Sequence, residues 1–245
     1  MSIMSYNGGT ILAMAGNECV CIATDLRLGE QMTTIATNVK KVHKLGDRVY
    51  IGLGGFYSDA KTVLDKILFR KNLYELRENR KIKPEKTFSE GIPEHMLRKV
   101  VEELMNGRQE AVGVVLVTTM ERCSVVAATM ISNLLYQHRF GGYLTEPLVA
   151  GLDPVTNKAY ICGMDTIGCI AAPKDFVAVG TGTEYLLGVC EGFWHENMNA
   201  DELFEATAQS MLSAMERDAA SGWGVLIYTI TKNKVNIKTI KARMD

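Results

Sequence analysis

Near the N-terminus, a short apolar run that starts with β-branched residues is followed by a run that alternates as a half-buried β-strand does. One run is Thr10–Ala15 and the other is Cys19–Asp25, and the Gly–Asn pair between them is typical of a tight turn. A second pair of runs, residues 41–45 and 49–54, flanks a Gly–Asp turn. The pattern therefore predicts two antiparallel hairpins at the start of the chain.

The apolar period then changes to that of helices. After Ser58, a candidate N-cap, one stripe of apolar residues recurs at spacings of three and four: Ala60, Val63, Leu64, Ile67 and Leu68. Further helices are predicted from Met130 to the glycine pair at 141–142, over residues 182–194, and after Asn199. Asn199 and Glu202 have the spacing of a capping box.

Short strands fill the remaining sequence, and their ranges are 147–151, 159–164, 168–172, 176–180, 224–231 and 234–240. The elements therefore occur as strands, helices, strands, helices and strands. Hairpins combined with pairs of helices predict an α+β fold in which two antiparallel sheets are stacked between helical layers. The sequence contains no repeat or Ser/Pro-rich linker, so we expect a single domain over residues 1–245.

Composition narrows the function without identifying it. Of 245 residues, 27 are basic and 28 acidic, so no basic excess points to nucleic acid or an anionic membrane surface. No apolar run approaches membrane-spanning length, and the N-terminus lacks the features of a signal peptide. The six scattered cysteines lack the spacing of a metal site, which predicts buried free thiols in a reducing compartment. We expect a soluble intracellular protein without a metal or cofactor.

Many motifs, in order, resemble the β-type subunits of the 20S proteasome, which belong to the N-terminal-nucleophile hydrolase superfamily. They are MSIMSYNGG, RVYIGLGG, FRKNLYELRENRKIKP, RFGGYLTEPLVAGLDP, MDTIGC, RDAASGWG and KARMD, and they are most similar to the β-3 subfamily. The resemblance implies a four-layer αββα sandwich and a place in one of the two inner rings of a four-ring barrel. It covers nearly the whole chain except one internal block.

That block comprises residues 91–129. Its first part has an amphipathic helical pattern after Pro93, and its second part is strongly β-prone and almost free of charge. It could be a genuine insertion that folds as an extra helix and strand pair. We favour the alternative that the mature protein lacks it, because it interrupts the start of a core helix.

The resemblance also implies the chemistry of the family. The hydroxyl of an N-terminal threonine attacks a peptide carbonyl while its own amino group accepts the proton. A nearby aspartate and lysine adjust the reactivity of this hydroxyl and amino group electrostatically. A backbone N–H from a glycine-rich turn stabilises the oxyanion. The matching positions here are the strand-end aspartate Asp25, the lysine Lys41, the oxyanion glycine Gly55, and the supporting residues Thr181, Asp218 and Ser221.

The nucleophile itself is the exception. The sequence Gly8–Gly9–Thr10 suggests cleavage before a threonine, but Thr10 precedes Asp25 by 15 residues and Lys41 by 31. The family's spacing is one residue longer in both cases, which places Gly9 at the nucleophile position. A shift of one residue in a strand turns a side chain to the opposite face. We therefore expect Thr10 to point away from Asp25 and Lys41, and residues 1–8 to remain attached.

The sequence thus predicts a catalytically silent, structural subunit of the β ring. The resemblance implies contacts with adjacent β subunits, β-2 and β-4, and with the α ring, in the cytoplasm and nucleus. Such a subunit would support ATP- and ubiquitin-dependent protein degradation through assembly and by shaping a neighbouring active-site pocket. The alternatives are an active threonine protease that uses Thr10 after processing, and a free-standing hydrolase or binding module. The retained Asp25, Lys41 and Asp218 are then interpreted as a buried polar cluster rather than as residual chemistry.

Overall fold

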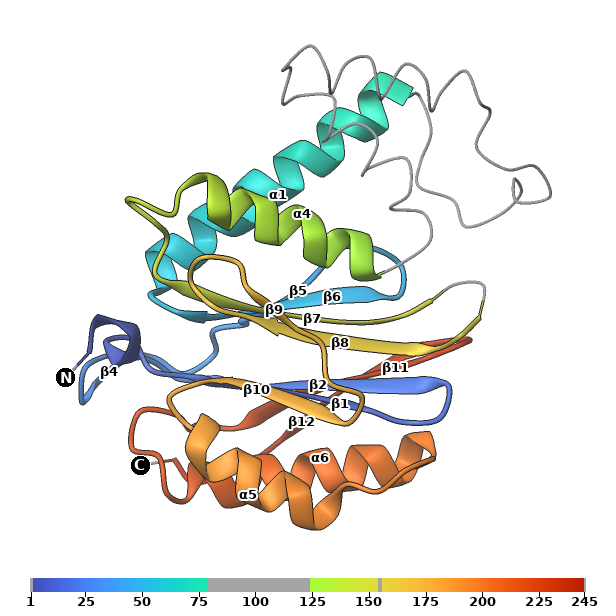
Figure 1. Cartoon of the computed structure of the whole chain (residues 1–245). Coiled ribbons are helices and arrows are strands. Elements are labelled where there is room, and N and C mark those ends of the chain that lie inside the picture. The colour runs from blue at the N-terminus through green and yellow to red at the C-terminus, as the bar shows by residue number, and fades with distance from the viewer. Residues whose placement is uncertain (1, 79–123, 154–155, 245) are drawn as a thin grey trace.

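Two antiparallel sheets form the centre of the molecule (Figure 1). The computed structural model describes residues 2–78, 124–153 and 156–244. The first sheet has five strands in the order β10-β1-β2-β11-β12. Their bounds are β1 (Thr10–Ala15), β2 (Cys19–Asp25), β10 (Phe176–Gly180), β11 (Val225–Thr231) and β12 (Val235–Ile240).

The second sheet also has five strands, in the order β5-β6-β7-β8-β9. Their bounds are β5 (Val42–Lys44), β6 (Val49–Gly55), β7 (Thr145–Leu152), β8 (Ala159–Met164) and β9 (Ile170–Ala171). Every pairing within the two sheets is antiparallel. Most of these strands were predicted from apolar runs bounded by turn residues, several of them with the same bounds.

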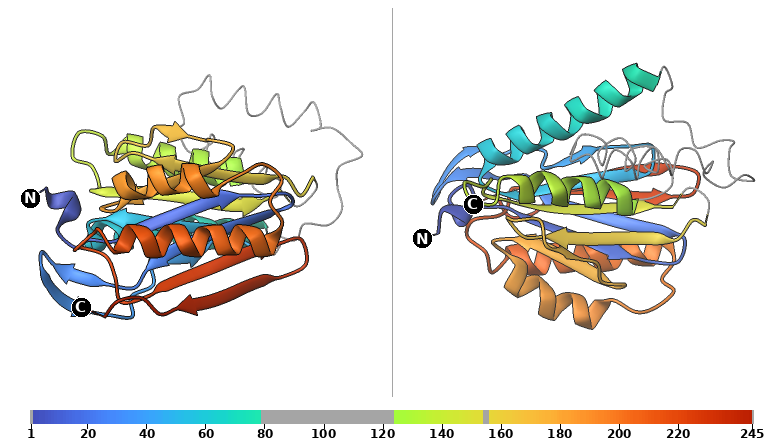
Figure 2. Two further views of the ribbon diagram at one scale, coloured as in Figure 1. Left: turned by 90° about the horizontal axis from the view of Figure 1, so that it is seen from below. Right: turned by 45° about the horizontal axis from the view of Figure 1, so that its top comes forward.

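Helices cover both outer faces of the stacked sheets. The pair α1 (Tyr57–Glu78) and α4 (Ser124–Gln137) lies over the second sheet, and α5 (Thr183–Phe193) and α6 (Ala200–Met215) lie over the first. Seen from below, α5 and α6 run side by side (Figure 2, left). This arrangement is the αββα sandwich, and the predicted α+β fold is confirmed.

Three apolar clusters hold the four layers together. The cluster between the sheets includes Ile11, Ile22 and Leu148, all fully buried. A second cluster joins the first sheet to α5 and α6, and a third joins the second sheet to α1 and α4. Alternate residues of β1 and β2 therefore serve different clusters, because successive side chains of a strand point to opposite faces.

Helix α4 begins earlier than the sequence predicts. Its first residues, 124–129, belong to the segment that was interpreted as β-prone, and the structure has them in the helix. Ala127 and Ala128 are buried against the second sheet. The β-branched residues in this stretch favour strands only weakly, and burial on a helix face overrides that preference. The remainder of the block, residues 91–123, lies outside the described residues.

Other local features also differ from or extend the predictions. A hairpin of β3 (Leu28–Glu30) and β4 (Thr33–Ala36) occupies a segment that was interpreted as a loop, and a short 3-10 helix covers Ile3–Ser5. The predicted capping box is confirmed, since Asn199 accepts hydrogen bonds from the start of α6 and Glu202 accepts one from the Asn199 amide.

The cysteines are free and buried at four described positions, Cys19, Cys21, Cys162 and Cys190, as predicted. Burial raises the pKa of the Cys21 thiol to about 12, and that of the Cys19 and Cys190 thiols to about 11. Cys169 is also free but exposed, so the prediction of buried thiols is wrong at this position. It directly precedes the short edge strand β9.

Candidate functional site

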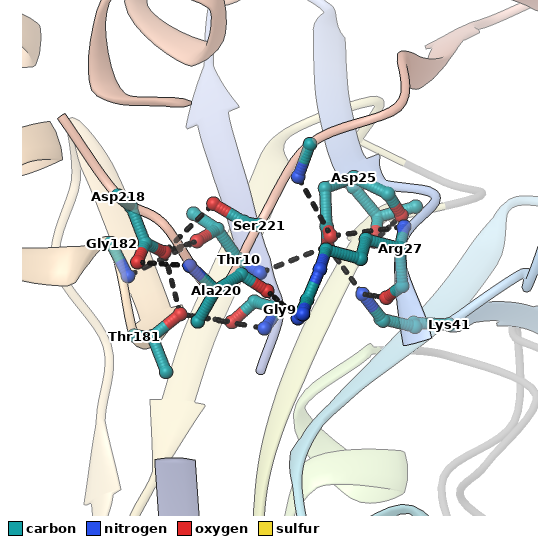
Figure 3. Close-up of polar contacts among 12 residues, drawn as sticks. Gly9, Thr10, Asp25, Arg27, Lys41, Thr181, Gly182, Asp218, Ala220 and Ser221 are labelled. Atoms are coloured by element: carbon teal, nitrogen blue, oxygen red, sulfur yellow. Dashed lines mark hydrogen bonds and ion pairs between the residues drawn. The ribbon is translucent and has the colours of Figure 1, made fainter. Parts of the chain in front are cut away.

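The predicted site residues other than Gly55 meet where β1 begins and β2 ends (Figure 3). β1 and β2 are paired so that Ile11 lies opposite Thr24, which brings Thr10 to the level of Asp25. Asp25 also pairs with Val225 of β11. The carboxyl group is thereby fixed by two neighbouring strands and is completely buried.

The Asp25 carboxylate accepts hydrogen bonds at both oxygens. Oδ1 accepts from Nζ of Lys41 at 2.5 Å and from the Thr10 amide at 3.0 Å. Oδ2 accepts from the Arg27 amide at 3.2 Å and from the Gly222 amide at 3.5 Å. Four donors from four separate segments of the chain thus surround a charge that would otherwise be costly to bury.

Lys41 reaches this carboxylate from the segment that leads into β5. Its side chain is 4% exposed, and Nζ donates both to Asp25 and to the Arg27 carbonyl, the latter at 2.6 Å. A buried ion pair tolerates the loss of one partner poorly, because the other charge is left without compensation. The position of the lysine ammonium is therefore closely fixed.

Gly9 lies next to this ammonium group. A β-carbon added to Gly9 would be 2.5 Å from Nζ of Lys41 and 2.9 Å from its Cε. The backbone of Gly9 has φ +126°, a conformation that side-chain-bearing residues rarely adopt. A side chain at position 9 would thus point directly at Lys41, and this structure has no space for it.

Thr10, the next residue, directs its side chain elsewhere. Its hydroxyl accepts a hydrogen bond from the Gly182 amide at 3.1 Å and donates to Oδ2 of Asp218 at 3.4 Å. Only its backbone amide faces Asp25. Thr10 is completely buried between the two carboxylates, with its amide bound to one and its hydroxyl to the other (Figure 3).

Asp218 forms the centre of a second polar cluster. Its Oδ2 accepts from the hydroxyls of Thr181 at 2.6 Å and Ser221 at 2.7 Å, and its Oδ1 accepts from the Ala220 amide at 3.0 Å. Thr181 also joins this cluster to Gly9, since its hydroxyl accepts from the Gly9 amide at 3.4 Å. The predicted supporting residues are therefore brought together, but around Asp218 and apart from the Asp25–Lys41 pair.

Gly55, the predicted oxyanion glycine, lies at the end of β6. Its φ is +91°, and a β-carbon there would be 2.6 Å from the Leu144 carbonyl and 2.9 Å from Cε of Met4. Its nearest neighbours are therefore Leu144 and a side chain of the N-terminal segment. The structure brings Gly55 into neither of the two polar clusters.

Arg27 is a site residue whose role the sequence did not reveal. Its guanidinium donates to the Ala220 carbonyl, the Gln31 carbonyl and the Thr34 hydroxyl, at 2.9, 3.1 and 3.1 Å. It thereby connects the Asp25 region with the turn that carries Asp218. The Asp–x–Arg spacing at the end of β2 was the available signal, but the partners come from distant segments.

Comparison with known proteins decides the family. A sequence model described as "Proteasome subunit" matches residues 5–120 and 115–230. The chain is similar to proteins named proteasome subunit beta type-3 from Caenorhabditis elegans and Drosophila melanogaster, at 65% and 45% identity over 245 residues, covering 100% of both chains. A probable proteasome subunit beta type-3 from Schizosaccharomyces pombe is 39% identical over the same span.

The chain belongs to the proteasome family. The resemblance inferred from its motifs is confirmed, and so is the sandwich fold expected of that family. Membership means that the chain belongs among the subunits of a protease complex and assembles with other proteasome subunits.

Two further kinds of site are absent from the described residues. Among the described helices, none is long and apolar enough to cross a membrane. Within residues 2–78, 124–153 and 156–244, no three His, Cys, Asp or Glu side chains are grouped so that they could hold a metal ion.

Proposed function

We propose that the chain is a non-catalytic, structural subunit of the β ring of the 20S proteasome core particle. The observation that carries the proposal is the position of Gly9. The side chain that would face Lys41 and Asp25 belongs to residue 9, and glycine has no hydroxyl that could attack a peptide bond.

The geometry of Thr10 supports the same proposal. A nucleophile in this family requires a free amino group and an accessible hydroxyl on the same residue. The Thr10 amide donates to Asp25, its hydroxyl is bound to Gly182 and Asp218, and the residue is completely buried. An active protease that uses Thr10 would need all of these contacts to be rearranged.

The names of the relatives suggest the place of the chain in the particle. Proteins called proteasome subunit beta type-3 are similar to it along its whole length. We therefore place it at the β-3 position, next to β-2 and β-4 and in contact with the α ring, in the cytoplasm and nucleus. Its role there is to complete the ring and to shape the pocket of a neighbouring active subunit, in ATP- and ubiquitin-dependent degradation.

The test is to treat purified particles with an electrophilic peptide that forms an adduct with N-terminal threonines, and then to measure the intact mass of each subunit. We expect no adduct on this chain and an N-terminus that precedes Gly9. Active β subunits in the same particles serve as the internal control. A chain that begins at Thr10 and carries the adduct would overturn the proposal. A monomeric native mass would instead favour a free-standing hydrolase or binding module.

A further inference from the structure

The pair Asn7–Gly8 has a reactivity of its own, because the backbone nitrogen after an asparagine can attack the side-chain amide. Glycine at the second position favours this attack, since it has no β-carbon to hinder the approach. The Gly8 nitrogen loses its proton and bonds to Cγ of Asn7, Nδ2 leaves as ammonia, and a cyclic succinimide forms. Water then opens the ring and leaves aspartate or isoaspartate at position 7.

The fold requires both residues of this labile pair. Gly8 has φ +67°, and a β-carbon there would collide with the Ala220 carbonyl oxygen. Asn7 is buried, and its side-chain amide bonds in two directions. Nδ2 donates to the Gly29 carbonyl at 2.9 Å, and Oδ1 accepts from the Tyr57 amide at 3.0 Å. Neither residue can therefore be exchanged for a less reactive one without a loss of buried contacts.

The same contacts hold the pair in its unreacted form. Ring closure removes Nδ2, and with it the bond to Gly29, and it draws the side-chain carbonyl from the Tyr57 amide toward Gly8. The backbone carbonyl of Asn7 accepts from the Gly29 amide at 3.0 Å, so the main chain beside the ring is held as well. The need to break two hydrogen bonds slows the reaction by about tenfold or more.

We propose that Asn7–Gly8 is a deamidation site that is open in the unfolded chain and closed by folding. Deamidation before folding places a carboxylate opposite the Gly29 carbonyl at a buried position. Of the two partners of this side chain, only the Tyr57 amide can donate to that carboxylate. Isoaspartate also lengthens the main chain. A chain that has reacted while unfolded therefore docks its N-terminal segment poorly and enters particles less often.

The first test compares the full chain in guanidinium chloride with the assembled particle, both kept in the same mildly alkaline buffer. The tryptic peptide that ends at Arg27 contains both Asn7 and Asn17, and its fragmentation locates the conversion of amide to carboxylate. We expect Asn7 to react in the unfolded chain and at least about tenfold more slowly in the particle. Asn17 precedes glutamate and is the slow reference, and the second Asn–Gly pair, at 106–107, is the fast reference in the unfolded chain.

The outcomes separate this proposal from the proposed function. Equal deamidation of Asn7 in both samples, or none in the unfolded chain while the reference pair reacts, would overturn the proposal alone. A particle subunit that begins at Thr10 would overturn it together with the proposed function, because Asn7 would have been removed. Neither sample is assayed for proteolysis, so catalytic silence has no influence on the comparison.

The second test measures the effect of the product on assembly. Asn7→Asp and the unchanged chain, with different tags, are expressed together and their shares in purified particles are compared. We expect the share of Asn7→Asp to be at least about fivefold lower, the effect of one lost buried hydrogen bond and an unpaired charge. Asn17→Asp adds the same charge at an exposed position and is the matched control, with an unchanged share. Equal incorporation of Asn7→Asp and the unchanged chain would overturn the inferred effect on assembly.

Discussion

Gly9 and Lys41 approach so closely that a β-carbon on the glycine would lie 2.5 Å from the lysine ammonium. That ammonium is held by Asp25 and by the Arg27 carbonyl and has little freedom to move. The contact identifies residue 9 as the position whose side chain would face the retained charged pair.

Replacing Gly9 by alanine should therefore destabilise the chain. The new methyl group must displace Lys41, and the backbone conformation at φ +126° is unfavourable for alanine. We expect a loss of about 1–3 kcal/mol in the free energy of unfolding, measured by urea denaturation of the purified chain. Gly188→Ala in α5 is the control, because nothing apart from its chain neighbours and its own helix backbone lies within 4 Å of its added β-carbon. That change should stabilise by about 0.5–1 kcal/mol. Equal effects at the two sites would contradict the prediction.

The buried Asp25–Lys41 pair should show strong coupling in a double-mutant cycle. Lys41→Met leaves the Asp25 carboxylate uncompensated and should cost about 3–5 kcal/mol, while the double change with Asp25→Asn should cost less than the sum of the single changes. The exposed pair of Lys44 and Asp47, at 3.3 Å, is the matched control. Lys44→Met should change stability by at most about 1 kcal/mol. Additive single effects at the buried pair would show that the two charges do not interact.

Stability should decrease in alkaline solution because of the buried thiols. Burial raises the pKa of Cys21 to about 12 and that of Cys19 and Cys190 to about 11, whereas a thiol in an unfolded chain titrates near ~8.5. The folded state thus favours the neutral thiols. Their contribution is fully present below the unfolded pKa and is lost as pH rises from there through the folded values.

Alkylation provides the measurement for these thiols. At pH 8.5, iodoacetamide should modify the exposed Cys169 and leave Cys19, Cys21 and Cys190 unmodified until the protein unfolds. The denatured chain, in which all of these thiols should react, is the control. Labelling of Cys21 in the folded protein at a rate similar to that of Cys169 would contradict the prediction.

The block of residues 91–129 gives a prediction about mass. We expect the intact mass of the subunit in purified particles to lack this block, because it interrupts a core helix and carries an aggregation-prone segment. In a subunit without this block, other residues would have to fill the positions of Ala127 and Ala128, which are buried against the second sheet. Peptides from residues 91–123 in a digest of the particles would show that the block is retained.

The sequence predicted helices with a clear apolar period, such as α6 with its capping box, because burial on one face of a helix imposes that period. It also predicted β1 and β2, which are rich in apolar residues because both of their faces are buried. It missed the β3–β4 hairpin, whose strands are short and half exposed, so no alternation marks them. It placed the start of α4 too late, because the residues before Met130 have a local preference for β-strands. Burial against the second sheet outweighs that preference in the structure.

The site was predictable as a set of residues but not as an arrangement. Counting from Asp25 and Lys41 selected Gly9, since strand register converts spacing in sequence into direction in space. The division into two clusters, with Thr10 bound to both, depends on where the loop at 218–222 meets the start of β1. The role of Arg27 depends on the same long-range contact. Such contacts leave no local pattern in the sequence.

The conformation of Gly9 also affects how a reaction could ever return to this site. A threonine there would need a different backbone conformation and a displaced Lys41 that still pairs with Asp25. Each change alone disturbs buried contacts and gives no activity in exchange. Activity at this site would therefore require both changes together, and a hydroxyl-bearing side chain added alone would not be enough.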